Sequence, residues 1–309
     1  MHKLLLATVA IAGMLSVSAA AEAKTLGIVA LLANDALNID VIGGATEAAK
    51  AAGWEVKVID TQASADKANA AMNTLAVEHV DAIFVLAFAS SSIGSGLDAA
   101  RQAHIPVATW GGELVPGIVV TTSGQQVGDD SAKFLLDKVG DTADILALTF
   151  HPGKLCIDRG VAFENAVKGK PDVKVTYSEV VVPGQVQSGN ALAQAWLTTH
   201  PGEEGRKLGI WSCWDEPTTG AVAALRQAGR SDVVISSING SPQAVQMVKD
   251  GDMTATTWQP AHEEGKQVFQ AILDSIAAGD SWKPKVITIP GVVVNADNVD
   301  QFMKDHPTQ

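Results

Sequence analysis

The sequence predicts an α/β protein built from two lobes, each a doubly wound parallel sheet with helices on both faces. Apolar segments typical of strands alternate with helix-like segments along most of the chain, and this series runs twice. Helices between successive strands act as crossover connections, which make the strands parallel. A third observation is a strand–turn–helix unit at 208–228, whose turn carries residues suited to binding.

This unit places chemically distinctive residues at the end of a strand. Leu208 to Trp211 is apolar, and Asp215 with Pro217 predicts a helix start, in which Asp215 acts as the side-chain cap. Ligands of open parallel sheets bind beyond the carboxyl ends of the strands. The residues expected there are Cys213, Trp214, Asp215 and Glu216. An exposed indole forfeits burial, so we expect Trp214 to be covered.

The first half of the chain shows four strands separated by helices. Its apolar runs predict strands at 25–32, 54–61, 81–88 and 105–110. Between them, helical spacing predicts helices at 38–52, 64–77 and 92–102. Gly53 ends the first helix, and Ser64 is the expected cap of the second.

The second half repeats the pattern after an extended segment at 117–123. Strands are predicted at 143–150, 173–181, 208–211, 232–238 and 253–258. Helices are predicted at 131–139, 159–167, 191–199, 241–250 and 261–278. Two extended pieces, 286–290 and 291–295, close the series, and the last helix can return to the first half.

The N-terminus has the composition of a secretory signal. His2 and Lys3 precede an apolar run that ends in small residues, which predicts a signal peptide at 1–23 and a mature chain from Lys24. The run is too short for a membrane span, and no cysteine stands at the cleavage point to take a lipid. We therefore expect an exported periplasmic protein that is neither embedded in a membrane nor lipid-anchored.

Charge and length narrow the classes further. The formal charge of −12 argues against nucleic acid or an anionic membrane surface as partner. A hydrophobic content of 47% suits a well-packed α/β protein, and 309 residues exceed what one core usually serves. We expect two domains and a monomer.

No motif predicts catalysis. GxSxG, HExxH and P-loop patterns are absent from the sequence, and the histidines lie far from any paired nucleophile. The GxGxxA pattern at 94–99 comes too late after its strand to form a dinucleotide-binding turn. Neither CxxC nor paired histidines occur, so we expect a non-enzyme without metal or cofactor.

The two cysteines follow the first and third strands of the second half. In a sheet of order 2-1-3-4-5 these strands are neighbours, so Cys156 and Cys213 would emerge side by side. Export to an oxidising compartment favours a disulfide between them. The alternative is two buried thiols packed as small apolar side chains.

Seven segments, in this order and spacing, resemble the type I periplasmic solute-binding proteins of the ribose-binding class. They are GGATEAAKAAGWEV, DAIFVLAF, IPVATW, DRG with AFENAV, WDEPTTGAVAALRQAG, ISSINGSPQAVQMVKDG and MTATTWQPAHEEGKQ. The resemblance implies lobes of residues 24–123 plus 260–288 and 124–259 plus 289–309. It further implies a hinge of three crossings, closure over a small solute, and delivery to the transmembrane subunits of an ABC permease.

The resemblance also implies site residues. Arg159 matches the family's guanidinium, while Asn239 and Gln259 match polar residues that bind hydroxyls. Gly111 and Trp214 replace polar residues of the pentose binders, which puts pentose specificity in doubt. Three indoles fall at strand ends around the implied cleft: Trp110, Trp214 and Trp258.

Further candidates are Asp215, for which helix capping is the alternative role, and Lys154, which with His151 adds positive charge before the first helix of the second lobe. Phe88, Ser90, Asp35 and Ser123 complete the set. The three indoles also admit a simpler role as core filling.

Three functions remain open. A sugar or polyol can stack a C–H face on indole. A planar aromatic carboxylate or quinone-type cofactor can lie between tryptophan faces, with its charge against Arg159 and Lys154. The protein can also present its ligand to a membrane sensor instead of a permease.

Overall fold

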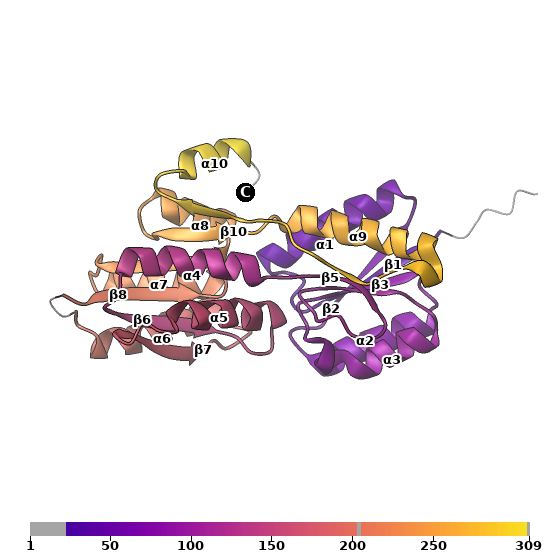
Figure 1. Cartoon of the computed structure of the whole chain (residues 1–309), viewed down its shortest axis with the longest axis horizontal. Coiled ribbons are helices and arrows are strands. Elements are labelled where there is room, and N and C mark those ends of the chain that lie inside the picture. The colour runs from indigo at the N-terminus through magenta and orange to yellow at the C-terminus, as the bar shows by residue number, and fades with distance from the viewer. Residues whose placement is uncertain (1–22, 203–204, 308–309) are drawn as a thin grey trace, which may run out of the picture.

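The computed structural model describes residues 23–202 and 205–307, and it forms two lobes side by side (Figure 1). Each lobe contains a six-stranded sheet that is mostly parallel, with helices on both faces. The predicted fold class is confirmed. The predicted signal peptide lies outside the described residues apart from Ala23.

The first lobe is built on the sheet β11-β5-β4-β3-β1-β2. Its strands are β1 (Thr25–Ala30), β2 (Glu55–Asp60), β3 (Ala82–Leu86), β4 (Val107–Trp110), β5 (Ile118–Thr122) and β11 (Lys285–Ile287), all paired in parallel. Its helices are α1 (Ala36–Ala51), α2 (Ala65–Val77), α3 (Gly94–Gln102) and α9 (Ala261–Ala278), with short 3₁₀ turns at Ser90–Ile93 and Gly279–Ser281.

The second lobe is built on the sheet β12-β10-β9-β8-β6-β7. Its strands are β6 (Ala143–Thr149), β7 (Val173–Glu179), β8 (Lys207–Ser212), β9 (Val233–Asn239), β10 (Ala255–Trp258) and β12 (Val292–Asn295). Its helices are α4 (Gln125–Val139), α5 (Lys154–Val167), α6 (Gln185–Thr199), α7 (Asp215–Gln227), α8 (Pro242–Lys249) and α10 (Val299–Asp305). The first five strands follow the predicted order 2-1-3-4-5, and β12 joins antiparallel to β10.

Local sequence explains where several elements begin and which face they bury. Strands β1 and β3 are buried along almost their whole length, as expected for central strands covered on both faces, whereas the edge strand β2 is mostly exposed. The predicted cap Ser64 accepts a hydrogen bond from the backbone N–H of Lys67 at 3.3 Å. At α8, Ser241 caps the helix in the same way and Pro242 occupies its first turn.

The start of α7 differs from the prediction. Trp214 occupies the position before the helix, and Asp215 is its first residue. The carboxylate of Asp215 does not cap α7; it accepts hydrogen bonds from Ser237, from the backbone N–H of Ser241 at 2.8 Å and from Thr256 at 2.8 Å. Asp215 therefore ties α7 to β9, β10 and the start of α8.

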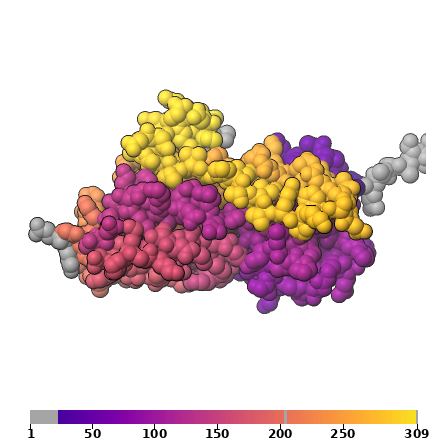
Figure 2. Space-filling model, in the orientation of Figure 1, coloured from indigo at the N-terminus to yellow at the C-terminus, as the bar shows by residue number. Residues whose placement is uncertain are grey.

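The chain passes three times from one sheet to the other, at residues 123–124, 259–260 and 288–291. These three crossings correspond to the three-crossing hinge that was predicted. In the space-filling view the two lobes abut, and the yellow C-terminal part of the chain runs over both (Figure 2). Within the described ranges, no helix is long and apolar enough to cross a membrane.

Candidate binding site

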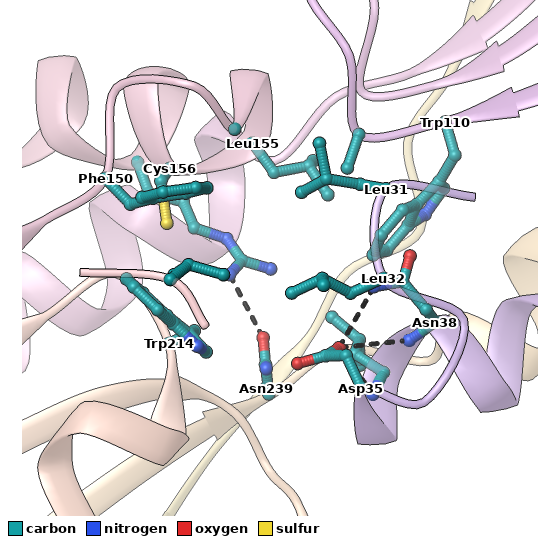
Figure 3. Close-up of a pocket in the computed structure, with 15 residues that line it drawn as sticks. Leu31, Leu32, Asp35, Asn38, Trp110, Phe150, Leu155, Cys156, Trp214 and Asn239 are labelled. Carbon is teal, nitrogen blue, oxygen red and sulfur yellow. Dashed lines mark hydrogen bonds between the residues drawn. The ribbon is translucent and has the colours of Figure 1, made fainter. Parts of the chain in front are cut away.

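A cavity lies between the two lobes, where the carboxyl ends of several strands face each other (Figure 3). The space inside it that the centre of a water molecule can reach is about 60 Å³. The first lobe contributes mainly Leu31, Leu32, Asp35, Leu37, Asn38 and Trp110. The second lobe contributes mainly Phe150, Leu155, Cys156, Arg159, Trp214 and Asn239.

The lobes are in direct contact around this cavity. The backbone N–H of Lys154 donates to the carbonyl of Ala87 across the gap at 2.9 Å. The ammonium of Lys154 lies 3.7 Å from a carboxylate oxygen of Glu113 in the first lobe and also pairs with Asp158 on its own helix. The structure therefore shows the closed arrangement of the lobes.

Arg159 is the buried cation of the site. Only 2% of its surface is exposed, and its guanidinium donates to the carbonyl of Cys213 at 2.6 Å. It also donates to Oδ1 of Asn239 at 3.0 Å and to Oε1 of Gln259 at 2.5 Å. Burial lowers the pKa of Arg159 to about 10, and nearby carboxyl groups oppose this shift. Arg159 stays charged at neutral pH and positions two of the predicted polar residues.

Glu264 and Asp215 are buried carboxyl groups that already have several donors. Glu264 on α9 accepts from the indole N–H of Trp110 at 2.6 Å and from the amide of Gln259 at 2.7 Å. Burial raises the pKa of Glu264, and these hydrogen bonds and the charge of Arg159 act in the opposite direction. For Asp215 too, burial raises the pKa against the donors described above.

A second pair of carboxyl groups spans the gap between the lobes. Asp35 caps α1, where its Oδ1 accepts from the backbone N–H groups of Leu37 at 3.1 Å and Asn38 at 3.2 Å. Glu216 comes from the first turn of α7 in the other lobe. Burial, the charge of Asp35 and the charge of Asp215 raise the pKa of Glu216 well above its usual value.

Two of the three predicted indoles line the cavity. Trp110 and Trp214 lie on opposite sides of it, and the ring of Phe150 lies 5.7 Å from that of Trp214 (Figure 3). Trp214 is 7% exposed, so it is covered as expected. Trp258 is not part of the cavity wall, because its indole packs on Phe302 at 5.5 Å and His306 at 4.4 Å. Trp258 instead lies beside α10, away from the wall formed by Trp110 and Trp214.

The predicted disulfide is present. Cys156 and Cys213 are bonded, with their Cα atoms 5.2 Å apart. The bond joins the start of α5, which carries Arg159, to the segment between β8 and α7, which carries Trp214. Cys156 itself lines the cavity.

The remaining candidates lie around the cavity. Gln259 accepts a hydrogen bond from Arg159 but does not line the cavity, and Gly111 adopts a positive φ of 81° beside Leu155. Phe88 is buried, and the hydroxyl of Ser90 donates to the carbonyl of Glu113 at 2.8 Å. Ser123, in the first crossing, accepts weakly from the N–H of Gln125 at 3.3 Å. Of the thirteen candidates, Asp35, Trp110, Arg159, Trp214 and Asn239 are brought together on the cavity wall.

Several wall residues were not predicted as site residues. Leu31 and Leu32 follow β1, Phe150 follows β6, and Asn38 and Leu155 lie in the first turns of α1 and α5, the helices after those strands. Their position after strands was a usable signal, because that edge of the sheet forms the cleft. Glu264 gave no such signal, since it lies in the first turn of α9 among ordinary helix residues. Asn239 has a φ of 131°, a strained conformation of the kind that clusters at functional sites.

The fold and this site define a two-lobed binding protein, and comparison with known proteins agrees. Residues 27–280 match the family described as periplasmic binding protein domain, and the chain belongs to that family. No group of three or more His, Cys, Asp or Glu that can hold a metal ion is found within residues 23–202 and 205–307.

Relatives with known names are similar over nearly the whole chain. The ribose import binding protein of Escherichia coli (strain K12) is 28% identical, over 92% of this chain and 96% of its own. The xylitol-binding protein of Mycolicibacterium smegmatis is 25% identical over 78% of this chain and 67% of its own. A solute-binding protein of an ABC transporter from Agrobacterium vitis, solved with bound allitol, superposes with a TM-score of 0.82 at 27% identity, covering 92% of this chain and 99% of that one.

Proposed function

We propose that this protein is the exported solute-binding component of an ABC importer, which captures a solute of sugar or polyol size between its lobes and delivers it to the permease subunits. Named relatives bind ribose, xylitol and allitol. The observation that carries the proposal is a cavity whose wall comes from both lobes, because only a ligand that contacts both can stabilise the closed form.

Four features of the proposal extend beyond family membership. They are export by the signal peptide at 1–23, absence of a lipid anchor, a monomeric state, and lobes that move as residues 24–123 plus 260–288 against 124–259 plus 289–309. The three crossings at 123–124, 259–260 and 288–291 support these lobe boundaries.

A planar aromatic carboxylate is less well matched to the cavity. Its charge was expected against Arg159 and Lys154. The NH1 and NH2 groups of Arg159 already donate to protein acceptors, and Lys154 pairs with Asp158 and Glu113. An anion entering the cavity would meet the carboxylate of Asp35 instead.

Tryptophan fluorescence tests the proposal. Titration with pentoses, hexoses, polyols and aromatic acids should change emission only for the true solute class, because Trp110 and Trp214 line the cavity. Trp214→Ala should weaken binding by about tenfold or more, equivalent to roughly 1.4 kcal/mol. The matched control is Trp282→Ala, whose indole N–H donates to the carbonyl of Val119 away from the cavity. Equal affinities for wild type and Trp214→Ala would contradict the assigned site.

A further inference from the structure

Two buried hydrogen-bond acceptors lack donors within residues 23–202 and 205–307, one on the cavity wall and one on Glu216, which lies next to the wall residue Asp35. Asn38 is 5% exposed and lines the cavity, yet its Oδ1 has no partner among the described residues. Its amide nitrogen is used, since it donates to Oδ1 of Asp35 at 3.2 Å. The buried Oε2 of Glu216 likewise finds no donor within the described part of the chain. Buried acceptors are costly unless something donates to them, so the site calls for a ligand with donors.

The donors of the site are largely committed to protein acceptors. Trp110 donates to Glu264, and the NH1 and NH2 groups of Arg159 donate to three oxygens of the protein. The Nε of Arg159 has no acceptor in the described ranges, and it lies beside Gly124 of the first crossing. Each hydroxyl of a polyol both donates and accepts, whereas an ammonium group only donates. Because free acceptors remain while most donors are already used, this site favours a ligand with an ammonium group over a ligand with another hydroxyl group in its place.

Charge points the same way. The four carboxyl groups that act on Arg159 are Glu264 from α9, Asp215 and Glu216 from α7, and Asp35 before α1. Arg159 is the one cation among these five groups. Glu264 and Asp215 accept from several donors, and Oδ1 of Asp35 accepts from Leu37 and Asn38. Glu216 faces Asp35 between the lobes, and its Oε2 has no donor within the described residues. A proton held by Glu216 relieves their repulsion in the unliganded closed form, and a ligand cation can take its place.

The apolar part of the wall suits a cation as well. Trp110, Phe150 and Trp214 line the cavity, and the electron-rich faces of aromatic rings attract ammonium groups. The same rings can pack against the C–H face of a sugar-sized solute.

We propose that the solute carries a protonated amine, which Asp35 and Asn38 bind together with Glu216 from the other lobe. The rest of the solute lies against Trp110, Phe150 and Trp214. This inference rests on the proposed function and narrows its solute class to amine-bearing molecules of sugar or polyol size. The ammonium brings three N–H donors and one positive charge. On its arrival Glu216 releases its proton to solvent, so Asp35 and Glu216 both become carboxylates and the charge of the site stays balanced.

Calorimetry with matched pairs tests the proposal. The pairs are glucosamine with glucose, serinol with glycerol, and cyclohexylamine with cyclohexanol, in which an ammonium replaces one hydroxyl. At least one amine should bind about tenfold or more tighter than its hydroxyl partner. Titrations in buffers of different ionisation enthalpy should show protons released with the amine and none with the alcohol. Amine affinity should rise by up to about tenfold per pH unit while Glu216 is still protonated.

Two variants separate this proposal from the proposed function. Glu216→Gln should abolish proton release, and the ratio of amine affinity to alcohol affinity should fall towards one. Asp35→Asn keeps a good helix cap and should weaken amine binding as well. Glu263→Gln is the control, because Glu263 also lies in the first turn of a helix but is exposed. Binding of the alcohols as tightly as the amines, or an unchanged preference in Glu216→Gln, overturns the ammonium proposal and leaves solute capture between the lobes standing.

Discussion

Arg159 is the residue on which the charge balance of the cleft depends. It is buried and surrounded by carboxyl groups, two of which, Glu264 and Asp215, are buried with it. Removing one partner of a buried charge cluster leaves uncompensated charge, which typically costs about 3–5 kcal/mol. We expect Arg159→Met to lower the free energy of unfolding by about 3 kcal/mol at pH 8, measured by urea denaturation.

The loss should be smaller at pH 5. Without Arg159 the pKa values of Glu264 and Asp215 rise further. A carboxyl group whose pKa is raised by folding favours the folded state at low pH, and this contribution is lost as the pH rises through the raised pKa. Arg101→Met is the matched control, because Arg101 pairs with Asp98 at an exposed site, and it should change stability by less than about 0.5 kcal/mol. A loss in Arg159→Met that is equal at both pH values would contradict this account.

At the scale of elements, the disulfide fixes the start of α5 against the segment between β8 and α7. Cys156 and Cys213 are separated by 57 residues, and closing a loop of that length in the unfolded chain stabilises the folded state by about 4 kcal/mol. The double variant Cys156→Ser/Cys213→Ser should lose roughly this much stability. Addition of a reductant should then lower the unfolding midpoint of the wild type but not of the variant. Unfolding midpoints of wild type that are equal with and without reductant would refute the prediction.

Elements were predictable to the extent that local spacing determines them. Strand β3 is apolar throughout and β1 is apolar after Thr25. Trp110 and Trp214 could be placed in the cleft because each ends or follows a strand, whereas Asn239 was placed there by the resemblance. Trp258 also ends a strand, but α10 docks beside β12 and brings Phe302 and His306 against that indole, which spacing along the chain does not indicate. Glu264 was missed for a different reason: it lies in the first turn of α9, and local spacing does not show that its carboxylate accepts from Trp110.

At the scale of the whole molecule, closure brings Gly111 of the first lobe against Leu155 of the second. A Cβ atom added at Gly111 would lie 2.5 Å from the side chain of Leu155. We expect Gly111→Ala to hinder closure and to weaken solute binding by about tenfold, because the lobes must separate to relieve this overlap. Small-angle scattering with saturating solute should give a larger radius of gyration for Gly111→Ala than for wild type.

Gly117→Ala isolates the effect of the lobe contact from backbone strain. Gly117 also has a positive φ, of 100°, but nothing lies within 4 Å of the added Cβ atom. Both variants should lose roughly 1 kcal/mol of stability through the unfavourable backbone conformation. Only Gly111→Ala should bind the solute more weakly. Similar binding losses in the two variants would show that strain, not closure, is responsible.

The three crossings also have a consequence for biosynthesis. Strand β5 stays an unpaired edge until β11, at residues 285–287, has been synthesised, and β10 waits in the same way for β12. Neither sheet is complete before the last tenth or so of the chain leaves the ribosome, so both lobes finish assembling only after nearly the whole chain has been synthesised. Chains that stop short of residue 285 would leave both edges open to association with other molecules.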